Sequence, residues 1–279
     1  MMTEIDLRPP FDRLWKGEDP FEKVFALGGE EFRSVKNRRT FRIEIGGEGF
    51  FVKIHRGAGW AEIFKNLVQF KMPVTGAGNE YRALKKLREA GIPTMEIAAF
   101  GERGVNPANR ESFLITRELT GTRSLEDVAL GGAVPVPLKH RIIRALGASC
   151  GAMHRAGVNH RDCYLCHYLL RVDPADAPDV KLSVIDLHRA QIRRTVPFRY
   201  RVKDVAGLLF SSFDVPLCRA DVWRFLHAYW GKKGSIRGEL AENRRFYEAV
   251  HRSARKLYFK EFAKHPEQDP FAREKGMDK

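Results

Sequence analysis

Hydrophobic and polar positions alternate over much of residues 31–56 of this 279-residue chain. The segments FRSV, TFRIEI and FFVKIH are rich in β-branched and aromatic residues, and a Gly-Gly-Glu-Gly turn separates the last two. These runs predict three strands that pair antiparallel. Residues 95–100 and 112–119 predict two more strands, with a loop rich in Gly, Asn and Pro between them.

Hydrophobic positions recur at helical spacing in residues 78–90 and again from residue 137 onward. Gly91 is placed as the C-terminal stop of the first of these helices. The later helices are expected at 138–156, 202–213, 220–230 and 239–264. We therefore expect an α+β fold: a small, antiparallel β-rich N-terminal lobe at 1–119, a larger helical C-terminal lobe at 120–265 and a mobile tail at 266–279.

One more helix is predicted at residues 60–71, where Trp60, Ile63, Phe64 and Leu67 follow helical spacing. We expect this apolar stripe to pack on the N-terminal lobe. The alternative is that the stripe lies against lipid or against an acyl-bearing protein partner.

The net charge of +14 predicts an anionic partner, which could be nucleic acid, an anionic membrane surface or a phosphorylated substrate. Four cysteines, all between residues 150 and 218, do not form a disulfide framework. No apolar run approaches the roughly 18 residues of a membrane-spanning helix. The N-terminus, MMTEIDLRPP, lacks the basic start and apolar stretch of a signal peptide. We therefore expect a cytosolic protein.

The candidate chemistry lies in GVNHRDCYLCHYL at 157–169 and in VIDLH, which follows it. The His160-Arg161-Asp162 tripeptide indicates the catalytic loop of a phosphotransferase, with Asp162 as the base that accepts the proton of a substrate hydroxyl. Asp186 follows the apolar strand LSVI, so it emerges at a strand end where it could bind Mg²⁺.

The same residues allow two other interpretations. Cys163, Cys166 and His167 match the C-x-x-C-H pattern of covalent haem attachment, which would require export. With His160 they could form a zinc set, but adjacent Cys166 and His167 rarely converge on one tetrahedral ion. The phosphotransferase interpretation is favoured over both.

Lys53 and Glu80 add support from the N-terminal lobe. Lys53 lies on the predicted strand FFVKIH, and Glu80 shares a helical stripe with Leu84 and Leu87. A half-buried carboxylate requires a cation, which a lysine on an adjacent strand can supply.

The ordered set of Lys53, Glu80, the HRD tripeptide and Asp186 resembles the bilobal protein kinase fold. The chain resembles the lipopolysaccharide core heptose(I) kinases of Gram-negative bacteria from about Phe11 to Tyr258. Three segments carry the resemblance: FVKIHRGAGWAEIFKNL, GVNHRDCYLCHYLL and LSVIDLHRAQ. The resemblance implies ATP-dependent phosphorylation of the first heptose of the inner core, on the cytoplasmic side of the inner membrane.

The resemblance also implies residue roles. Lys53 would contact the α- and β-phosphates of ATP, and Glu80 would orient it. Glu118-Leu119 would form the hinge beside adenine. Asp204 would brace the catalytic loop that begins at His160.

Three departures from the general kinase pattern stand out. No G-x-G-x-x-G precedes Lys53, and the first hairpin would place the cations of Lys36 and Arg38 where backbone amides usually bind phosphate. The position five after Asp162, usually an asparagine that holds a second metal, is His167, whose imidazole is a poor ligand for Mg²⁺. There is no A-P-E motif, which favours a non-protein acceptor.

The segment between Asp186 and Asp204 is basic and contains no acid. This pattern predicts an anionic acceptor, such as the carboxylates and phosphates of lipopolysaccharide. The candidate acceptor-binding residues are Arg189, Arg193, Arg194 and Arg199. Two alternatives remain: a kinase-like phosphotransferase for another sugar or small molecule, and a non-catalytic kinase-fold module that binds anionic glycolipid. We expect no nucleic acid partner.

Overall fold

The computed structural model describes residues 3–35, 37–57, 59, 60, 64, 68, 76–132, 134–171, 180–231 and 236–263. The chain forms two compact units. The first comprises residues 1–122 together with 183–191, and the second comprises 123–182 together with 192–279. The segment that carries Asp186 therefore belongs to the first unit, although it follows much of the second in the sequence.

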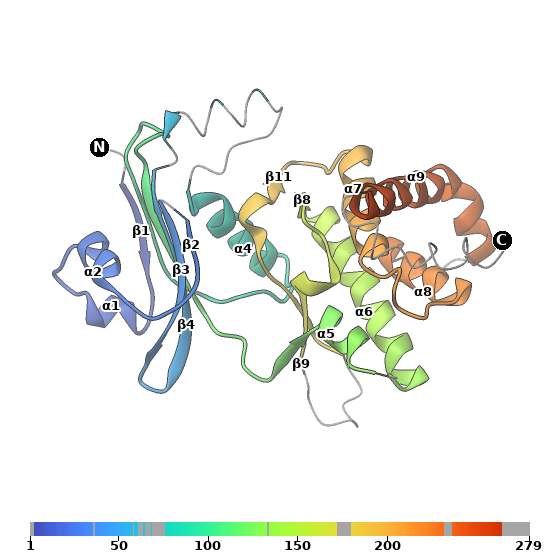
Figure 1. Ribbon diagram of the computed structural model, residues 1–279, viewed down its shortest axis with the longest axis horizontal. Helices are drawn as coiled ribbons and strands as arrows, with labels where there is room; N and C mark the ends of the chain where they lie inside the picture. Colours follow the sequence, from blue (N-terminus) through green and yellow to red (C-terminus); the bar gives the residue numbers. More distant parts are fainter. Residues whose placement is uncertain are drawn as a thin grey trace. The chain divides into compact units, whose positions relative to one another are not determined.

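A six-stranded antiparallel sheet forms the centre of the first unit, in the order β1-β5-β6-β4-β3-β2 (Figure 1). The strands are β1 (Thr3–Leu7), β2 (Glu30–Val35), β3 (Arg38–Ile45), β4 (Glu48–Arg56), β5 (Ile97–Arg103) and β6 (Glu111–Arg117). The predicted meander over residues 31–56 is confirmed as β2, β3 and β4. Because side chains alternate along β4, Val52 and Lys53 face opposite sides of the sheet.

Three helices accompany this sheet: α1 (Phe11–Leu14), α2 (Pro20–Ala26) and α4 (Gly78–Glu89). Phe11 and Phe21 from the first two helices pack into the core with Val52 of β4 and Phe113 of β6. The boundaries of α4 match the prediction, and Gly91 after it has a positive φ of 69°, a conformation that glycine adopts at little cost. Strand β1 and helices α1 and α2 lie within residues 1–30, where no element was predicted.

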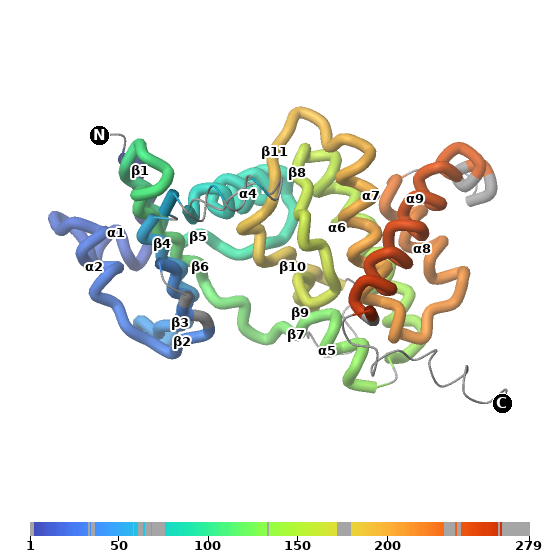
Figure 2. The backbone as a smooth tube through the Cα atoms, turned by 45° about the horizontal axis from the view of Figure 1, so that its top comes forward, coloured from blue at the N-terminus to red at the C-terminus, as the bar shows by residue number. Residues whose placement is uncertain are grey.

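The second unit is mainly helical, as expected. Its helices are α5 (Leu125–Leu130), α6 (Val136–Arg155), α7 (Phe198–Phe210), α8 (Arg219–Trp230) and α9 (Ile236–Phe262). Gly147 and Gly151 let α6 approach α8 closely, since a Cβ at either position would overlap a backbone carbonyl oxygen of α8. Figure 2 shows the same tight group of helices from a second direction.

Short elements connect these helices. They are β7 (Thr122–Ser124), β8 (Val158–Asn159), β9 (Tyr168–Arg171), β10 (Leu182–Val184), β11 (Gln191–Ile192) and two 3₁₀ turns, η1 (Leu165–His167) and η2 (Leu187–Arg189). The α+β fold with a strand-rich first part and a helical second part is confirmed. The mobile tail expected at 266–279 lies outside the described residues.

Most of the helix predicted at 60–71 also lies outside the described residues, including Ile63 and Leu67. The prediction that Trp60 and Phe64 pack on the N-terminal lobe is wrong, because these side chains are 52% and 60% exposed. Helical spacing identifies an apolar stripe but does not say what covers it. Within the described residues, no helix combines the length and apolar composition needed to cross a membrane.

Candidate active site

Lys53 and Glu80 form an ion pair in the first unit. The Lys53 ammonium lies 2.7 Å from Oε1 and 2.9 Å from Oε2 of Glu80. Glu80 is only 2% exposed, on the buried face of α4. Burial opposes the charge on Lys53, but Glu80 and Asp186 outweigh it and raise the pKa of the lysine above its ordinary value. Lys53 is therefore a permanent cation, and the pairing expected from the sequence is present.

Asp186, in the second stretch of sequence that belongs to the first unit, also contacts Lys53. Its Oδ1 lies 3.4 Å from the Lys53 ammonium and 2.8 Å from Nδ1 of His188. The Asp186 backbone is left-handed, with φ 58° and ψ 54°, where the chain turns from β10 into η2. This turn brings the carboxylate next to the lysine.

Asn79, which the sequence analysis did not single out, fixes that turn on α4. Its amide nitrogen donates to the carbonyl oxygens of His188, at 2.9 Å, and Ala190, at 2.7 Å. Asn79 precedes Glu80, so consecutive residues of α4 hold the segment that carries Asp186 and the lysine beside it. The only sequence signal was a polar side chain next to the buried glutamate.

His55 lies two residues beyond Lys53 on β4. Burial, followed by the positive charges of Arg38 and Lys53, lowers the pKa of His55 from 6.5 to about 3. The strand register pairs Arg38 with His55, which accounts for that influence. Arg38, a predicted phosphate contact, is thus beside the Lys53 cluster. Lys36, the other cation of this hairpin, lies outside the described residues.

Glu118 and Leu119, the predicted hinge, follow β6. The Glu118 carboxylate accepts hydrogen bonds from Arg42 at 2.9 and 2.8 Å, and its backbone N–H donates to the Gly49 carbonyl at 2.9 Å. The Leu119 carbonyl accepts from the Thr122 hydroxyl at 2.7 Å. The Glu118 contacts bind the segment to β3 and β4, and the Leu119 contact closes a local turn.

The catalytic loop of the second unit is organised around Asp204, which is 1% exposed on α7. Its carboxylate accepts the backbone N–H groups of His160, at 2.6 Å, and Arg161, at 2.9 Å, and lies 3.1 Å from Nε2 of His154. Burial opposes protonation of His154, but Cys150 and Asp204 raise its pKa above the ordinary value. The other ring nitrogen lies 2.8 Å from the Tyr229 hydroxyl. The family resemblance implied a brace at Asp204, and no sequence pattern pointed to His154 or Tyr229.

Asp162 follows this anchored dipeptide, and its side chain is partly exposed. Nδ1 of His167 donates to the Asp162 carbonyl at 2.7 Å, and the His167 ring stacks on His160 with centroids 5.4 Å apart. Because Nδ1 is occupied, His167 offers only Nε2 to a metal ion. The hydrogen bond from His167 holds the backbone at Asp162 in place.

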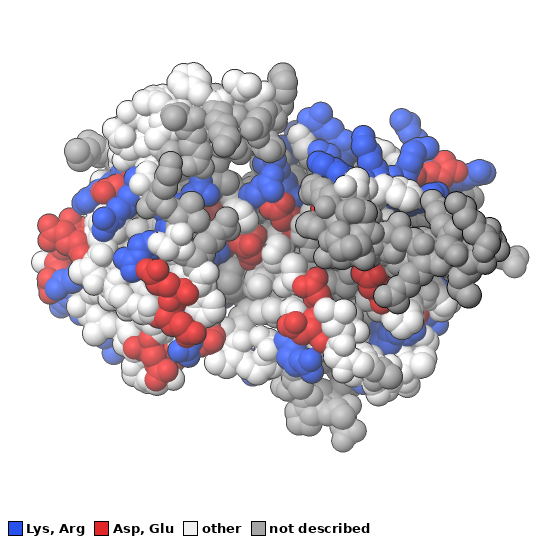
Figure 3. All heavy atoms as spheres, in the orientation of Figure 1, with Lys and Arg blue, Asp and Glu red and all other residues white. Residues whose placement is uncertain are grey.

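The arginines of the basic segment differ in their exposure to solvent and in their contacts. Arg193 donates to Oδ1 of Asn159 at 2.6 Å, and its guanidinium lies 4.4 Å from the Tyr200 ring centroid. Its backbone N–H donates to the Gly157 carbonyl at 2.8 Å. Arg194 and Arg199 are exposed, whereas Arg189 is half-buried in the first unit. Figure 3 shows Lys and Arg gathered on the part of the second unit where Figure 1 has α7 and α9.

A divalent cation would depend mainly on Asp186. Among the described residues, no group of three or more His, Cys, Asp or Glu side chains is arranged to hold a metal ion. This arrangement fits Mg²⁺, which proteins commonly bind through one or two carboxylates with substrate phosphates and water completing the shell. Cys163 is buried, with its sulfur 3.6 Å from the Tyr168 hydroxyl, and Cys166 is half-buried.

Comparison with known proteins agrees with this geometry. The family model described as lipopolysaccharide kinase (Kdo/WaaP) family matches residues 22–229. The chain is 49% identical over 256 residues to the lipopolysaccharide core heptose(I) kinase WaaP of Pseudomonas aeruginosa, with 90% of this chain and 95% of that protein covered. It is 47% identical over 230 residues to the WaaP of Escherichia coli, covering 81% of this chain and 87% of that protein.

A solved structure described as WaaP in complex with acyl carrier protein is also similar. It matches with a TM-score of 0.79 and 44% identity, covering 91% of this chain and 99% of the other. The resemblance to heptose(I) kinases noted in the sequence is confirmed, and so is the expected fold.

Proposed function

Because the chain belongs to the lipopolysaccharide kinase (Kdo/WaaP) family, we propose that it transfers the γ-phosphate of ATP to the first heptose of the lipopolysaccharide inner core. The observation that carries the proposal is the cluster of Lys53, Glu80 and Asp186 in the first unit. A buried glutamate that holds a lysine beside an aspartate able to bind a metal ion is the arrangement that protein kinases use for phosphoryl transfer.

In this proposal the first unit binds the nucleotide. Lys53 contacts the phosphates, and Glu80 keeps the ammonium in place. Arg38 begins β3 on the side of the sheet where a hairpin would cover the phosphates, Lys36 remains a predicted phosphate contact, and the backbone at Glu118-Leu119 would receive adenine. Asp186 would hold Mg²⁺, which would neutralise charge on the phosphates.

The second unit acts on the acceptor. Asp162 accepts the proton of the heptose hydroxyl as that oxygen attacks the γ-phosphorus and the bond to ADP breaks. Asp204 supports this step by holding the two residues before Asp162. Because Arg194 and Arg199 are exposed, they are the cations of the basic segment best placed to meet the carboxylates and phosphates of the acceptor. The reaction then takes place at the cytoplasmic face of the inner membrane, where the acceptor is anchored.

The direct test is ATP-dependent phosphate transfer to dephosphorylated core lipopolysaccharide, with the product linkage mapped. Asp162→Asn should abolish nearly all transfer while leaving ATP affinity close to that of the unmodified protein, because Asp162 acts on the acceptor. Asp214→Asn, at an exposed aspartate, is the matched control and should keep full activity.

The result also separates the alternatives. Transfer to another sugar or to an antibiotic, but not to lipopolysaccharide, would indicate a different acceptor. Binding of lipopolysaccharide with no transfer under any condition would indicate a glycolipid-binding module.

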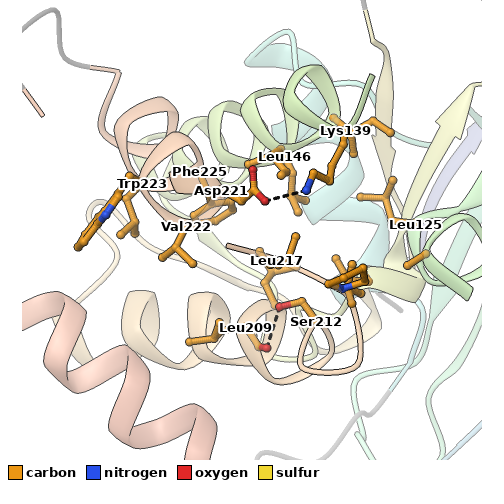
Figure 4. Close-up of a pocket in the computed structure, with 18 of the residues that line it drawn as sticks. Leu125, Lys139, Leu146, Leu209, Ser212, Leu217, Asp221, Val222, Trp223 and Phe225 are labelled. Atoms are coloured by element: carbon orange, nitrogen blue, oxygen red, sulfur yellow. Dashed lines mark hydrogen bonds and ion pairs between the residues drawn. The ribbon is translucent and has the colours of Figure 1, made fainter. Parts of the chain in front are cut away.

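We further propose an acyl carrier protein as a partner, as in the similar solved complex. The second unit contains a cavity of about 620 Å³ lined mainly by apolar side chains (Figure 4). Leu125, Leu146, Leu209 and Leu217 are among them. This volume is typical of ligand-binding cavities, and the lining suits an acyl chain.

The rim of that cavity favours an acidic protein. Glu248 and His251 of α9 line both the cavity and an adjacent surface hollow, which also includes exposed Arg252, Arg255 and Lys256. Basic side chains beside an apolar opening complement an acidic surface that presents an acyl chain. The Arg252→Glu, Arg255→Glu double variant should weaken binding of acylated carrier, whereas Arg88→Glu, exposed on α4, should not. Equal binding by both variants would place the partner elsewhere.

A further inference from the structure

The first turn of α7 presents an exposed aromatic ring. Phe198 is 40% exposed, although it packs edge-to-face with the buried ring of Phe246 on α9, with centroids 5.8 Å apart and planes at 78°. The guanidinium of Arg245, also on α9, lies 5.6 Å from the centroid of the Phe198 ring. Phe198 is therefore held in place by α9 while part of its ring faces solvent.

Tyr200, in the same turn of α7, is contacted by two arginines. The guanidinium of Arg193 lies 4.4 Å from the centroid of its ring, and that of Arg199 lies 4.5 Å from it. Arg199 also donates from Nη2 to the Tyr200 hydroxyl at 2.8 Å. An arginine that is already restrained in this way loses less conformational entropy when it binds an anion. Because Arg199 is exposed, a ligand can reach it.

Arg193 connects this surface to the catalytic loop. Its guanidinium donates to Oδ1 of Asn159 at 2.6 Å, and Asn159 lies three residues before Asp162. Three residues of fully extended chain span at most about 10 Å. The surface is therefore close enough to Asp162 to meet a neighbouring part of an acceptor whose hydroxyl group lies at that carboxylate.

The exposed cations of this surface lack acidic partners. Among the residues that the structure describes, no carboxylate forms an ion pair with Arg199 or Arg245. Arg244, by contrast, pairs with Glu248 at 2.8 Å. Guanidinium groups beside an aromatic ring suit a sugar that carries a carboxylate or a phosphate. The C–H face of such a sugar can stack on the ring while its anionic group accepts guanidinium N–H bonds.

We infer that Phe198, Arg199 and Arg245 form a subsite for an anionic sugar of the acceptor, next to the sugar that receives the phosphate. The inference rests on the proposed kinase activity and specifies which part of the acceptor is recognised. The sugar ring stacks on Phe198, and its carboxylate or phosphate binds the two arginines. These contacts are the same before and during transfer, so they lower KM for the acceptor and leave kcat unchanged.

Steady-state kinetics of the full-length protein with deacylated core lipopolysaccharide test the aromatic contact. Phe198→Ala should raise KM for the acceptor by about tenfold, which corresponds to about 1.4 kcal/mol of lost binding, and leave kcat and KM for ATP unchanged. Phe198→Leu keeps apolar bulk against Phe246 and should give a similar rise, so a folding defect of the alanine variant cannot decide the result. Leu130→Ala, at a 74% exposed position on α5, is the control and should keep the original KM.

Adjacent arginines of α9 test the charge. Arg245→Gln should raise KM for the acceptor severalfold, and the rise should shrink as salt is added, whereas Arg244→Gln should leave KM unchanged. Two modified acceptors identify the anionic group: one has its carboxylates reduced to alcohols, and the other has its phosphates removed. The effect of Arg245→Gln should disappear with the acceptor that lacks the bound group, while the effect of Phe198→Ala should persist.

The inference is overturned if both Phe198 variants keep the original KM for the acceptor, or if Arg245→Gln has the same effect on both modified acceptors. If the unmodified protein transfers no phosphate to any acceptor, the kinase proposal fails. Calorimetric titration of the same deacylated acceptor into the unmodified protein and into Phe198→Leu then decides on the subsite alone. Weaker binding by the variant supports the subsite, and equal binding overturns it.

Discussion

Two buried carboxylates, one in each unit, are satisfied in different ways. Glu80 in the first unit is paired with the side chain of Lys53, whose exposed fraction is 20%. Asp204 in the second unit accepts two backbone N–H groups and a buried histidine. The partner of Glu80 is a side chain that solvent can partly reach, whereas the partners of Asp204 are two backbone N–H groups and the buried ring of His154.

The difference indicates what each carboxylate does. A side-chain partner can contact a ligand directly, so under the proposed function Glu80 would orient the Lys53 cation for the nucleotide. Backbone partners fix the path of the chain, so Asp204 would position Asp162 through the two residues before it.

The largest effect should come from Asp204→Ala. It leaves two backbone donors and His154 without their acceptor inside the unit, which should lower the free energy of unfolding by about 3–5 kcal/mol. Urea denaturation measures this loss. Glu80→Ala should cost clearly less, because Lys53 can be solvated. Equal losses for the two variants would contradict the distinction between the carboxylates.

A smaller loss of stability but a strong loss of activity is expected for Glu80→Gln. The amide keeps the shape and can still accept a hydrogen bond, but it removes the charge that orients Lys53. We expect kcat/KM for ATP to fall on the order of 10²-fold, as for loss of one preorganised electrostatic group. Steady-state kinetics with varied ATP measure it. Glu89→Gln, at the exposed end of the same helix, serves as the control and should leave kinetics unchanged.

Adjacent arginines provide a finer comparison within the second unit. Arg193→Ala removes the bond to Asn159 and the contact with Tyr200, so it should lower kcat with little change in KM for the acceptor. Arg194→Ala, at an exposed position, should instead raise KM by severalfold, an effect that weakens as salt is added. Matching kinetic effects in the two variants would show that both side chains contact the acceptor.

The smallest effect concerns pH. The pKa of His55 falls to about 3 in the folded protein, so the unfolded chain binds a proton that the folded chain refuses, and stability decreases as pH falls below about 6.5. The pKa of His154 is raised, so its contribution is present below about 6.5 and is lost as pH rises through the folded value. Each of the substitutions His55→Gln and His154→Gln should remove one pH dependence of the free energy of unfolding, and the two dependences have opposite signs. Denaturation of the two variants across a range of pH measures them. A slope of the same sign for both would show that the two rings do not differ in this way.

Local patterns predicted the parts of the site that depend on one element. Alternation along β4 and the buried stripe of α4 were enough to pair Lys53 with Glu80. The apolar run LSVI was enough to place Asp186 at a strand end. In each case the face of the strand or helix from which the side chain projects follows from residues a few positions away.

Features that depend on distant pairing could not be predicted. Strand β1 pairs with β5 about a hundred residues later, and Asn79 holds carbonyls of a segment beyond the second unit's catalytic loop. Charge pattern alone assigned Arg193 to the acceptor, because it does not reveal that this side chain binds Asn159. The exposure of Trp60 and Phe64 was missed for a related reason, since helical spacing does not show which part of the protein, if any, covers an apolar stripe.

The left-handed backbone at Asp186 determines which inactive protein is suitable for structural work and inhibitor screening. Arg161 and Asp186 are the only non-glycine residues with positive φ among those that the structure describes. Aspartate and asparagine tolerate this conformation better than alanine does. Asp186→Asn would therefore remove the negative charge while preserving the turn, whereas Asp186→Ala would combine loss of the carboxylate with a shift of the backbone. A compound that binds the asparagine protein can then be interpreted as binding to the shape of the native site.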